Sequence, residues 1–308
     1  MNRIKPHYST HLGALYLGKC EQVLRSQSFT KYIGKCQLIF TSPPFPLARP
    51  KKYDNHAEEK YIKWLASYAS LFKKFLRPDG SIVMEVGNSW VPQHPVMSTA
   101  AMEALLTFKK RGRFKLCQEI IWYNPARLPS PAQWVTVERI RLKDAFTRIW
   151  WMSPSERPKS DNSRILQPYS ASMKRLLKRK TYNAGLRPSE HRIGEKSFLK
   201  DHGGSIPPNV FDESLVPNVL KLGNTSYNRK YLDYCEKHQL ERHPARMPPR
   251  LASFFIKLLT DVDDIVLDPF AGSNTTGSAA QKLRRRWISI EMNQIYADGS
   301  KAFFSKVV

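Results

Sequence analysis

The chain has 308 residues and 41% hydrophobic content, enough to bury a sizeable core in one large α/β domain or in two smaller ones. Its 50 lysines and arginines against 26 aspartates and glutamates give a formal net charge of +24, which favours a polyanionic partner, nucleic acid before anionic membrane. A membrane protein has no support, because the sequence lacks an apolar run of about 18 residues and an apolar signal core, so we expect a soluble cytoplasmic protein.

Strands and helices alternate through the first half of the chain. Residues 13–24 predict a short strand, a glycine turn and the start of a helix. The next predicted elements, in order, are a strand at 37–42, a helix at 58–76 ended by an RPDG turn, a strand at 81–87, a helix at 95–110 and extended segments at 114–124 and 145–153. This alternation predicts an α/β fold with a doubly wound, mostly parallel sheet.

The pattern changes at about residues 155–209, where Pro, Ser, Gly and basic residues dominate and MKRLLKRK (173–180) is a dense positive cluster. We expect an irregular basic insertion here. Periodicity returns with a helix at 249–260, followed by the strand DIVLDPF, a glycine turn, a helix and the strand WISIEM. α/β units therefore flank the insertion.

The four cysteines, Cys20, Cys36, Cys117 and Cys235, are scattered and form no CxxC pair, which indicates free thiols in a reducing compartment. Cys235 and His238 have a ligand-like spacing, but two ligands do not make a metal site. We expect no metal.

The C-terminal unit has the pattern of a nucleotide-cofactor site. An apolar strand ends in Asp268, turns through Gly272, enters a helix near Asn274 and returns as a strand ending in Glu291. Gly272 lets the backbone approach a ligand, the helix start offers free N–H groups, and an acid about 20 residues onward can accept ribose hydroxyls. The turn lacks a third glycine and a basic residue, which argues against a pyrophosphate, whereas Asp268 suits a cationic ligand. The alternative is a tight turn that binds nothing.

TSPPF (41–45) resembles motif IV of the β-class amino-methyltransferases, S-adenosylmethionine enzymes that methylate exocyclic amines of DNA bases, and DPFAGSNTTG (268–277) resembles their motif I. The order also matches, because this class is circularly permuted, with the catalytic loop first and the cofactor loop near the C-terminus. Together with LPSP, RPSxHxI, GGSIPPN and HPAR, the motifs resemble the PvuII-type N4-cytosine methyltransferases over nearly the whole chain.

The chemistry of that family explains the residue types in TSPPF. The cytosine amine is a poor nucleophile because its lone pair is delocalised, so the enzyme must hold the nitrogen pyramidal. Ser42 Oγ and the Pro43 carbonyl can each accept an amino hydrogen, while Pro43 and Pro44 bring no competing N–H. Phe45 can stack on a base that has been flipped out of the duplex.

Glu85, in SIVMEVG, is the candidate base that takes the proton from the methylated nitrogen. By the resemblance it stands at the acidic position that partners the motif IV serine, where Asp is expected. The alternative is a surface carboxylate or a simple salt bridge.

The resemblance implies further cofactor residues. Glu291 matches the ribose-binding acid, and the HPARMP segment with His243 and Pro244 matches the motif that closes over the methionine end. Lys19 departs from the Asp that the family commonly has after the glycine, so the contact near the adenine is either absent or made by backbone. The other expected cofactor residues are Thr41, Asp268, Phe270, Gly272, Ser273, Asn274 and Thr275.

Candidate DNA contacts come from two regions. Residues 120–131 resemble the far wall of the flipped-base pocket, where Trp122 or Tyr123 can stack, although aromatic residues on a strand are more often core. The basic insertion occupies the target-recognition position, and a solvated face is the alternative there. Its candidate contacts are Lys174, Arg175, Lys178, Arg179, Lys180, Arg187 and His191.

These interpretations predict an S-adenosylmethionine-dependent methyltransferase that acts on cytosine N4 in double-stranded DNA, as the modification partner of a restriction endonuclease. Cytosine is favoured over adenine by SPP in place of DPP or NPP, so an adenine-N6 enzyme of the same class is the alternative. A DNA-binding protein without catalysis and an oxidoreductase are weaker alternatives. The predicted parts are a catalytic part (1–154), a target-recognition region (155–240) and a cofactor-binding part (241–308).

Overall fold

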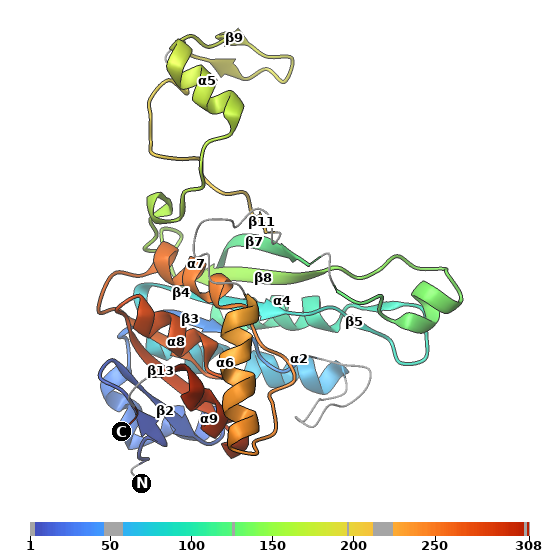
Figure 1. Ribbon diagram of the computed structural model, residues 1–308, viewed down its shortest axis with the longest axis vertical. Coiled ribbons are helices and arrows are strands. Elements are labelled where there is room, and N and C mark those ends of the chain that lie inside the picture. The colour runs from blue at the N-terminus through green and yellow to red at the C-terminus, as the bar shows by residue number, and fades with distance from the viewer. Residues whose placement is uncertain are drawn as a thin grey trace.

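The computed structural model describes residues 4–45, 58–124, 127–195, 197–211, 224–304 and 307. Its centre is a sheet of nine strands within those residues (Figure 1). In spatial order they are β1 (Tyr8–Ser9), β2 (Gly13–Leu17), β13 (Arg286–Glu291), β12 (Ile265–Asp268), β3 (Cys36–Thr41), β4 (Leu76–Val86), β8 (Phe146–Ser153), β7 (Lys115–Tyr123) and β11 (Val210–Phe211).

The five strands from β2 to β4 are parallel to one another. β8 runs antiparallel to both β4 and β7, β11 is parallel to β7, and β1 is antiparallel to β2. The carboxyl ends of β3, β4, β7, β12 and β13 therefore meet at one edge of the sheet, together with the start of β8. This arrangement confirms the predicted mixed α/β fold with a mostly parallel sheet.

Helices cover both faces of the sheet (Figure 1). One face carries α1 (Cys20–Arg25), α2 (Glu58–Ser67), α3 (Ala69–Phe75) and α4 (Ala100–Gly112), and the other carries α6 (Asn224–Lys237), α7 (Pro249–Leu259), α8 (Thr275–Lys282) and α9 (Gln294–Ser300). Short turns of helix occur at η1 (Gln27–Tyr32), η2 (Gln133–Val137), η3 (Asn162–Ile165) and η4 (Lys301–Phe303).

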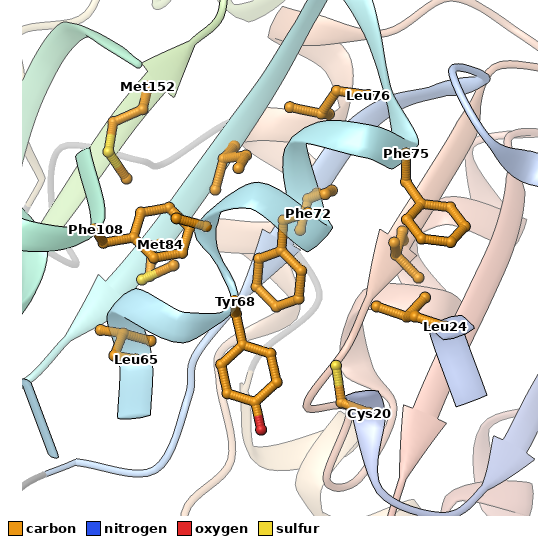
Figure 2. Close-up of a cluster of buried hydrophobic side chains, with 14 of the residues drawn as sticks. Cys20, Leu24, Leu65, Tyr68, Phe72, Phe75, Leu76, Met84, Phe108 and Met152 are labelled. Atoms are coloured by element: carbon orange, nitrogen blue, oxygen red, sulfur yellow. The ribbon is translucent and has the colours of Figure 1, made fainter. Parts of the chain in front are cut away.

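Each face of the sheet has its own hydrophobic core. Figure 2 shows part of the first, where Tyr68, Phe72 and Phe108 from α2–α4 and the segment joining them pack over Met84 of β4. In the second, Phe40 of β3 packs against Phe255 of α7, with ring centroids 5.5 Å apart. All six residues of β3 are buried. A strand covered on both faces reads as a continuous apolar run, which is why QLIFTS could be placed from sequence.

Three sequence-based boundaries differ from the structure. The predicted helix at 58–76 is interrupted at Tyr68, whose N–H bonds the Leu65 carbonyl three residues back at 3.2 Å. The RPDG segment is not a turn, because β4 already begins at Leu76 and the register with β3 shifts across this stretch. The predicted helix at 95–110 begins only at Ala100, after the short hairpin of β5 (Ser89–Trp90) and β6 (Met97–Ser98).

The basic insertion contains a regular helix, which corrects the expectation of an irregular stretch. MKRLLKRK lies in α5 (Ala171–Arg179) and its C-cap residue Lys180. Ser170 caps the helix by accepting the Met173 N–H at 3.2 Å, a signal that the basic run concealed. The helix is joined by the antiparallel pair β9 (Gly185–Leu186) and β10 (Arg192–Ile193).

Residues 167–195 and 197–205 form a lobe that stands away from the sheet, at the top of Figure 1, and we call it the basic lobe. A bridge between Gln167 and Ser205 closes its neck. A second projection, on the right of Figure 1, combines the β5–β6 hairpin with η2, where the rings of Trp90 and Trp134 lie 6.0 Å apart. In the described part of the chain no helix has the length and apolar character needed to cross a bilayer.

Candidate active site

The two loops with chemical motifs meet at the carboxyl edge of the sheet. β3 and β12 are neighbours, and the Thr41 hydroxyl at the end of β3 donates to Asp268 Oδ1 at the end of β12 over 2.8 Å. Both side chains are buried. The TSPPF loop and the glycine turn, separated by 227 positions in the chain, therefore leave the sheet side by side.

Asp268 is a buried acid whose carboxylate accepts hydrogen bonds from other residues of the protein. Besides Thr41, the Phe270 N–H donates to it at 3.1 Å and the Thr276 hydroxyl also donates. Burial is the larger influence and raises the pKa of Asp268 to about 6, although these donors favour the ionised form. The carboxylate is thus positioned firmly at the start of the glycine turn.

Glu291, at the end of β13, is the second acid of this turn. The Gly272 N–H donates to Glu291 Oε2 at 2.7 Å and the Asn293 N–H donates to Oε1 at 2.8 Å. Burial raises the pKa of Glu291, and the nearby charge of Asp268 raises it further. The turn is therefore bordered by two carboxylates that lie close enough to influence one another.

His243 lies directly over the glycine turn. Gly272 has φ +51°, and a Cβ built on it would lie 2.8 Å from His243 Nε2. The His243 ring also packs edge-on against Tyr296 of α9, with centroids 4.6 Å apart. The structure therefore brings the HPAR segment to the glycine turn, with Pro244 exposed beside it.

The remaining polar residues of the turn are Asn274 and the hydroxyl pair of Ser273 and Thr275. Asn274 is fully buried at the N-cap of α8, where it accepts from Gly277 N–H and from Ser289 and donates to Tyr8. Its amide therefore shapes the turn. The Ser273 and Thr275 hydroxyls lie 3.3 Å apart.

Phe270 is half-buried and faces Trp64 and Tyr68, at ring-centroid distances of 5.6 and 5.5 Å. Trp64 and Tyr68 belong to the segment 58–76, which the sequence marked only by its helical spacing of apolar residues. Tyr68 also donates a hydrogen bond to Glu21 of α1 at 3.0 Å. An acidic side chain therefore lies beside this aromatic group, whereas the side chain of Lys19 is exposed. The spacing of apolar residues did not identify Glu21 as a candidate site residue.

The second half of the site is built around Glu85, near the end of β4. Its side chain is 5% exposed, so the alternative of a surface carboxylate is wrong. The Ser42 and Thr147 hydroxyls donate to it, and the positive charge of Arg127 lies nearby. Burial is the largest influence and raises the pKa of Glu85 to about 7. Sequence analysis identified neither Thr147 nor Arg127.

The proline loop continues along the end of β4. Pro43 is buried and Pro44 and Phe45 are half-buried. Phe45 packs on Gly87, where an added Cβ would lie 2.8 Å from its ring, so this glycine is needed for close approach. The loop with Ser42 is therefore held against the strand that supplies Glu85.

The structure distinguishes the two aromatic candidates on β7. Trp122 pairs with Thr147 of β8 and packs with the core that includes Ile149. Tyr123 alternates to the opposite face and is 40% exposed. Only Trp122 shares the face of the sheet that carries Thr147 and Glu85.

The predicted DNA-contacting cations of the insertion lie in the basic lobe, which stands away from the central sheet (Figure 1). Arg187 donates to the Asn183 carbonyl at 2.6 Å and lies over the Tyr182 ring, and the His191 carbonyl accepts from the Arg187 N–H. The side chains of Lys174, Arg175, Lys178, Arg179, Lys180 and His191 are all exposed.

The four thiols are free. His238 packs on the Tyr234 ring, with centroids 4.2 Å apart, while Cys235 is buried in the second core. Within the described ranges, no group of three or more His, Cys, Asp or Glu side chains is arranged to hold a metal ion.

A parallel α/β sheet whose carboxyl edge carries a glycine turn and an acid on the next strand defines a protein of the nucleotide-cofactor-binding class. The chain belongs to the DNA methylase family, whose model matches residues 36–302. It is 42% identical over 298 residues to the type II methyltransferase M.PvuII of Proteus hauseri, covering 96% of this chain and 84% of that protein. It is also 24% identical over 264 residues to the DNA adenine methyltransferase YhdJ of Escherichia coli strain K12, covering 84% and 72%.

Solved structures give the same result. The structure is similar to the PvuII DNA methyltransferase, described as cytosine-N4-specific, with a TM-score of 0.75, 34% identity, and coverage of 98% of this chain and 90% of that chain. The M1.HpyAVI–SAM complex matches with a TM-score of 0.51 at 18% identity, covering 95% and 99%, a likeness of fold alone.

Proposed function

We propose that the protein transfers a methyl group from S-adenosylmethionine to the N4 amine of a cytosine in double-stranded DNA. The observation that carries this proposal is the hydrogen bond from Thr41 to Asp268, because it joins the serine–proline loop to the glycine turn. The name of the PvuII enzyme, cytosine-N4-specific, supports the choice of base at 34% identity.

The residues around the turn fit this cofactor. Two buried carboxylates, Asp268 and Glu291, border it, and residues 268–275 include no lysine or arginine. Such a site suits ribose hydroxyls and a cation, and does not suit a pyrophosphate. Glu291 would hold the ribose, while Asp268, Phe270 and His243 would line the remainder. When bound, the cofactor supplies a methyl group on cationic sulfur, which leaves as a neutral thioether with the bonding electron pair.

The protein's own groups act on the amine. The Ser42 hydroxyl donates to Glu85, which leaves its oxygen lone pairs to accept one amino hydrogen, and the Pro43 carbonyl accepts the other. These bonds favour a pyramidal nitrogen with an available lone pair. Once the nitrogen carries the methyl and a positive charge, its proton passes to the Glu85 carboxylate.

Trp122 supports base flipping. A cytosine inside a duplex is out of reach of Ser42, so the nucleotide must leave the stack, and an aromatic face compensates in part for the lost stacking, by about 1–3 kcal/mol. Trp122 lies on the same face as Glu85, one strand beyond Thr147. We assign it, and not Tyr123, to the wall of the base pocket.

The basic lobe is assigned to DNA phosphates and target recognition, in accord with the proposed division of the chain at about residues 155 and 240. The exposed cations of α5 can neutralise phosphates without reading sequence. A partner restriction endonuclease and action in the cytoplasm complete the proposal, and they rest on the type II name of M.PvuII.

Labelled methyl transfer to DNA tests the function. Wild-type protein is expected to label duplex DNA, and Ser42→Ala is expected to reduce the rate by about 10²–10³ while S-adenosylmethionine binding is kept. Equal background labelling in both proteins would identify a DNA-binding protein without catalysis. Mass spectrometry of the nucleosides settles the base, because N6-methyladenine without N4-methylcytosine would establish the adenine alternative.

A further inference from the structure

Glu85 is held by groups from three separate segments. Ser42 follows β3, Thr147 belongs to β8, and Arg127 follows β7, and each favours the ionised carboxylate. In the function proposed above, Ser42 also accepts an amino hydrogen of the substrate, so it contacts Glu85 and the substrate together. The proposed function gives Thr147 no contact with the substrate amine.

The position of Thr147 follows from strand register. Glu85 pairs with Ile149 across β4 and β8, and Thr147 lies two residues from Ile149 on the same face. Thr147 is 3% exposed. Valine has the same shape and an equal preference for strands, so the fold alone does not require an oxygen here. The hydroxyl is explained by Glu85, its hydrogen-bond acceptor.

Arg127 is fixed by neighbours of Thr147. Its guanidinium donates to the Phe146 carbonyl at 3.0 Å and lies 3.9 Å from Asp144 Oδ2. Asp144 in turn accepts from Asn88, the residue two beyond the end of β4, at 2.9 Å. This arrangement holds one positive charge near Glu85, with Asp144 as its counter-charge.

One further ion pair, between Arg148 and Glu119, lies on the opposite face of the sheet. Arg148 alternates away from Thr147 and pairs with Glu119 of β7 at 3.3 Å. Among the described residues, the groups that oppose the effect of burial on the pKa of Glu85 are Ser42, Arg127 and Thr147.

We propose that Thr147 is a positioning residue that holds the Glu85 carboxylate ionised and oriented toward Ser42, so that it can take the proton from the methylated amine. Its hydroxyl donates to the carboxylate alone, whereas Ser42 contacts both the carboxylate and the substrate. The inference rests on the proposed function for its catalytic meaning, but the link between Thr147 and Glu85 can be measured without catalysis.

The test compares Thr147→Val with Thr147→Ser. In Thr147→Val, the acidic limb of the pH profile of kcat is expected to move up by about one pH unit, because a donor to a buried carboxylate is lost. At a pH below the new midpoint, kcat of Thr147→Val should be about tenfold lower than kcat of the wild type, while KM for DNA and for the cofactor is unchanged. Thr147→Ser restores the wild-type midpoint. Ile149→Val, a packing change on the same face of β8, leaves the midpoint in place.

A purely structural role for Thr147 would lower kcat equally at every pH, and an unmoved midpoint in Thr147→Val would overturn the proposal. The second measurement is the pH dependence of urea unfolding, with Glu85→Gln as reference. Thr147→Val must move the Glu85 transition upward even if no DNA is methylated, so failure of the proposed function and failure of this inference are distinguishable. Should Thr147→Val not fold, Thr147→Ala serves in both experiments with the same expected directions.

Discussion

Thr41 at the end of β3 donates a hydrogen bond of 2.8 Å to Asp268 at the end of β12, and this bond connects the loop proposed to contact the base to the turn proposed to bind the cofactor. The two strands are neighbours in the sheet although they come from opposite ends of the chain. Strand pairing therefore places the glycine turn beside the loop that carries Ser42.

Thr41→Val removes this bond and leaves a buried carboxylate with one donor fewer. We expect a loss of about 1–3 kcal/mol in the free energy of unfolding at pH 8, together with weaker S-adenosylmethionine binding. Because the pKa of Asp268 is raised to about 6, the loss shrinks as the pH falls through 6 and the carboxyl becomes neutral. Urea unfolding at pH 5 and pH 8 and calorimetric titration with the cofactor measure both effects, and Thr41→Ser is the control.

The pKa of Glu85, raised to about 7, gives the reaction an acidic limb. Below this value the carboxyl is protonated and cannot accept a proton, so kcat/KM should fall about tenfold per pH unit. Glu85→Gln should lose about 10²–10⁴ in rate at pH 8 and should show no limb near 7. An acidic limb that is unchanged in Glu85→Gln would show that Glu85 is not the base.

The same ionisation predicts a stability effect of defined sign. A carboxyl whose folded pKa lies above its unfolded value favours folding when protonated, so the free energy of unfolding should decrease as the pH rises from about 4.5 to 7. Glu85→Gln should remove that decrease and gain at most about 3 kcal/mol over wild type at pH 8. Denaturant titrations across this range measure it.

Trp122 and Tyr123 are adjacent in sequence but lie on opposite faces of β7, so they form a matched pair. Trp122→Ala should weaken base flipping by about 1–3 kcal/mol, seen as reduced fluorescence of a cytosine analogue placed at the target. Tyr123→Ala should keep the wild-type signal. The reverse result would assign the pocket wall to the other face.

The basic lobe should contribute affinity that depends on salt and not on sequence. Replacing Lys178 and Arg179 of α5 by alanine should reduce the slope of log K against log salt by about 2 and weaken specific and non-specific DNA equally. Lys110 and Arg111, exposed at the end of α4 on the body of the protein, are the control pair. An equal change of slope in both pairs would remove the assignment of the lobe to DNA.

Gly272 has a backbone conformation that suits glycine, with φ +51°, and it lies directly beneath His243. Gly272→Ala should cost about 1–2 kcal/mol of stability from strain alone and should weaken S-adenosylmethionine binding further by displacing His243. Gly203, which also has positive φ but open space around it, provides the control: Gly203→Ala carries the strain without the clash. Calorimetry distinguishes the two effects.

The two loops and the alternation of strands and helices could be predicted from the sequence because buried parallel strands such as β3 and β12 are short apolar runs followed by marked turns. It did not locate Thr147 or Arg127, whose importance comes from the antiparallel pairing of β8 with β4. A threonine on a strand looks like any other β-branched residue until its neighbour across the sheet is known. For the same reason Trp122 and Tyr123 could not be separated before the register was fixed.

The errors in element boundaries also have physical causes. The apolar spacing of residues 58–76 continues through Tyr68, so periodicity could not show that the hydrogen-bond ladder is interrupted there. In the basic insertion, the excess of lysine and arginine suggested an irregular chain, whereas the Ser170 cap and the i, i+3, i+4 spacing of Met173, Leu176 and Leu177 are compatible with α5. The placement of the insertion against DNA stays a prediction.

The order of strands in the sheet has a consequence for biosynthesis. β12 and β13 lie between β2 and β3 in the centre of the sheet. Before the chain has been synthesised up to Glu291, β2 and β3 therefore each have an edge without its partner strand. The sheet can close only after β13 has been synthesised, and closure joins segments that are far apart in sequence, which makes folding slow. A fragment that ends before β13 should therefore be aggregation-prone and unable to methylate DNA.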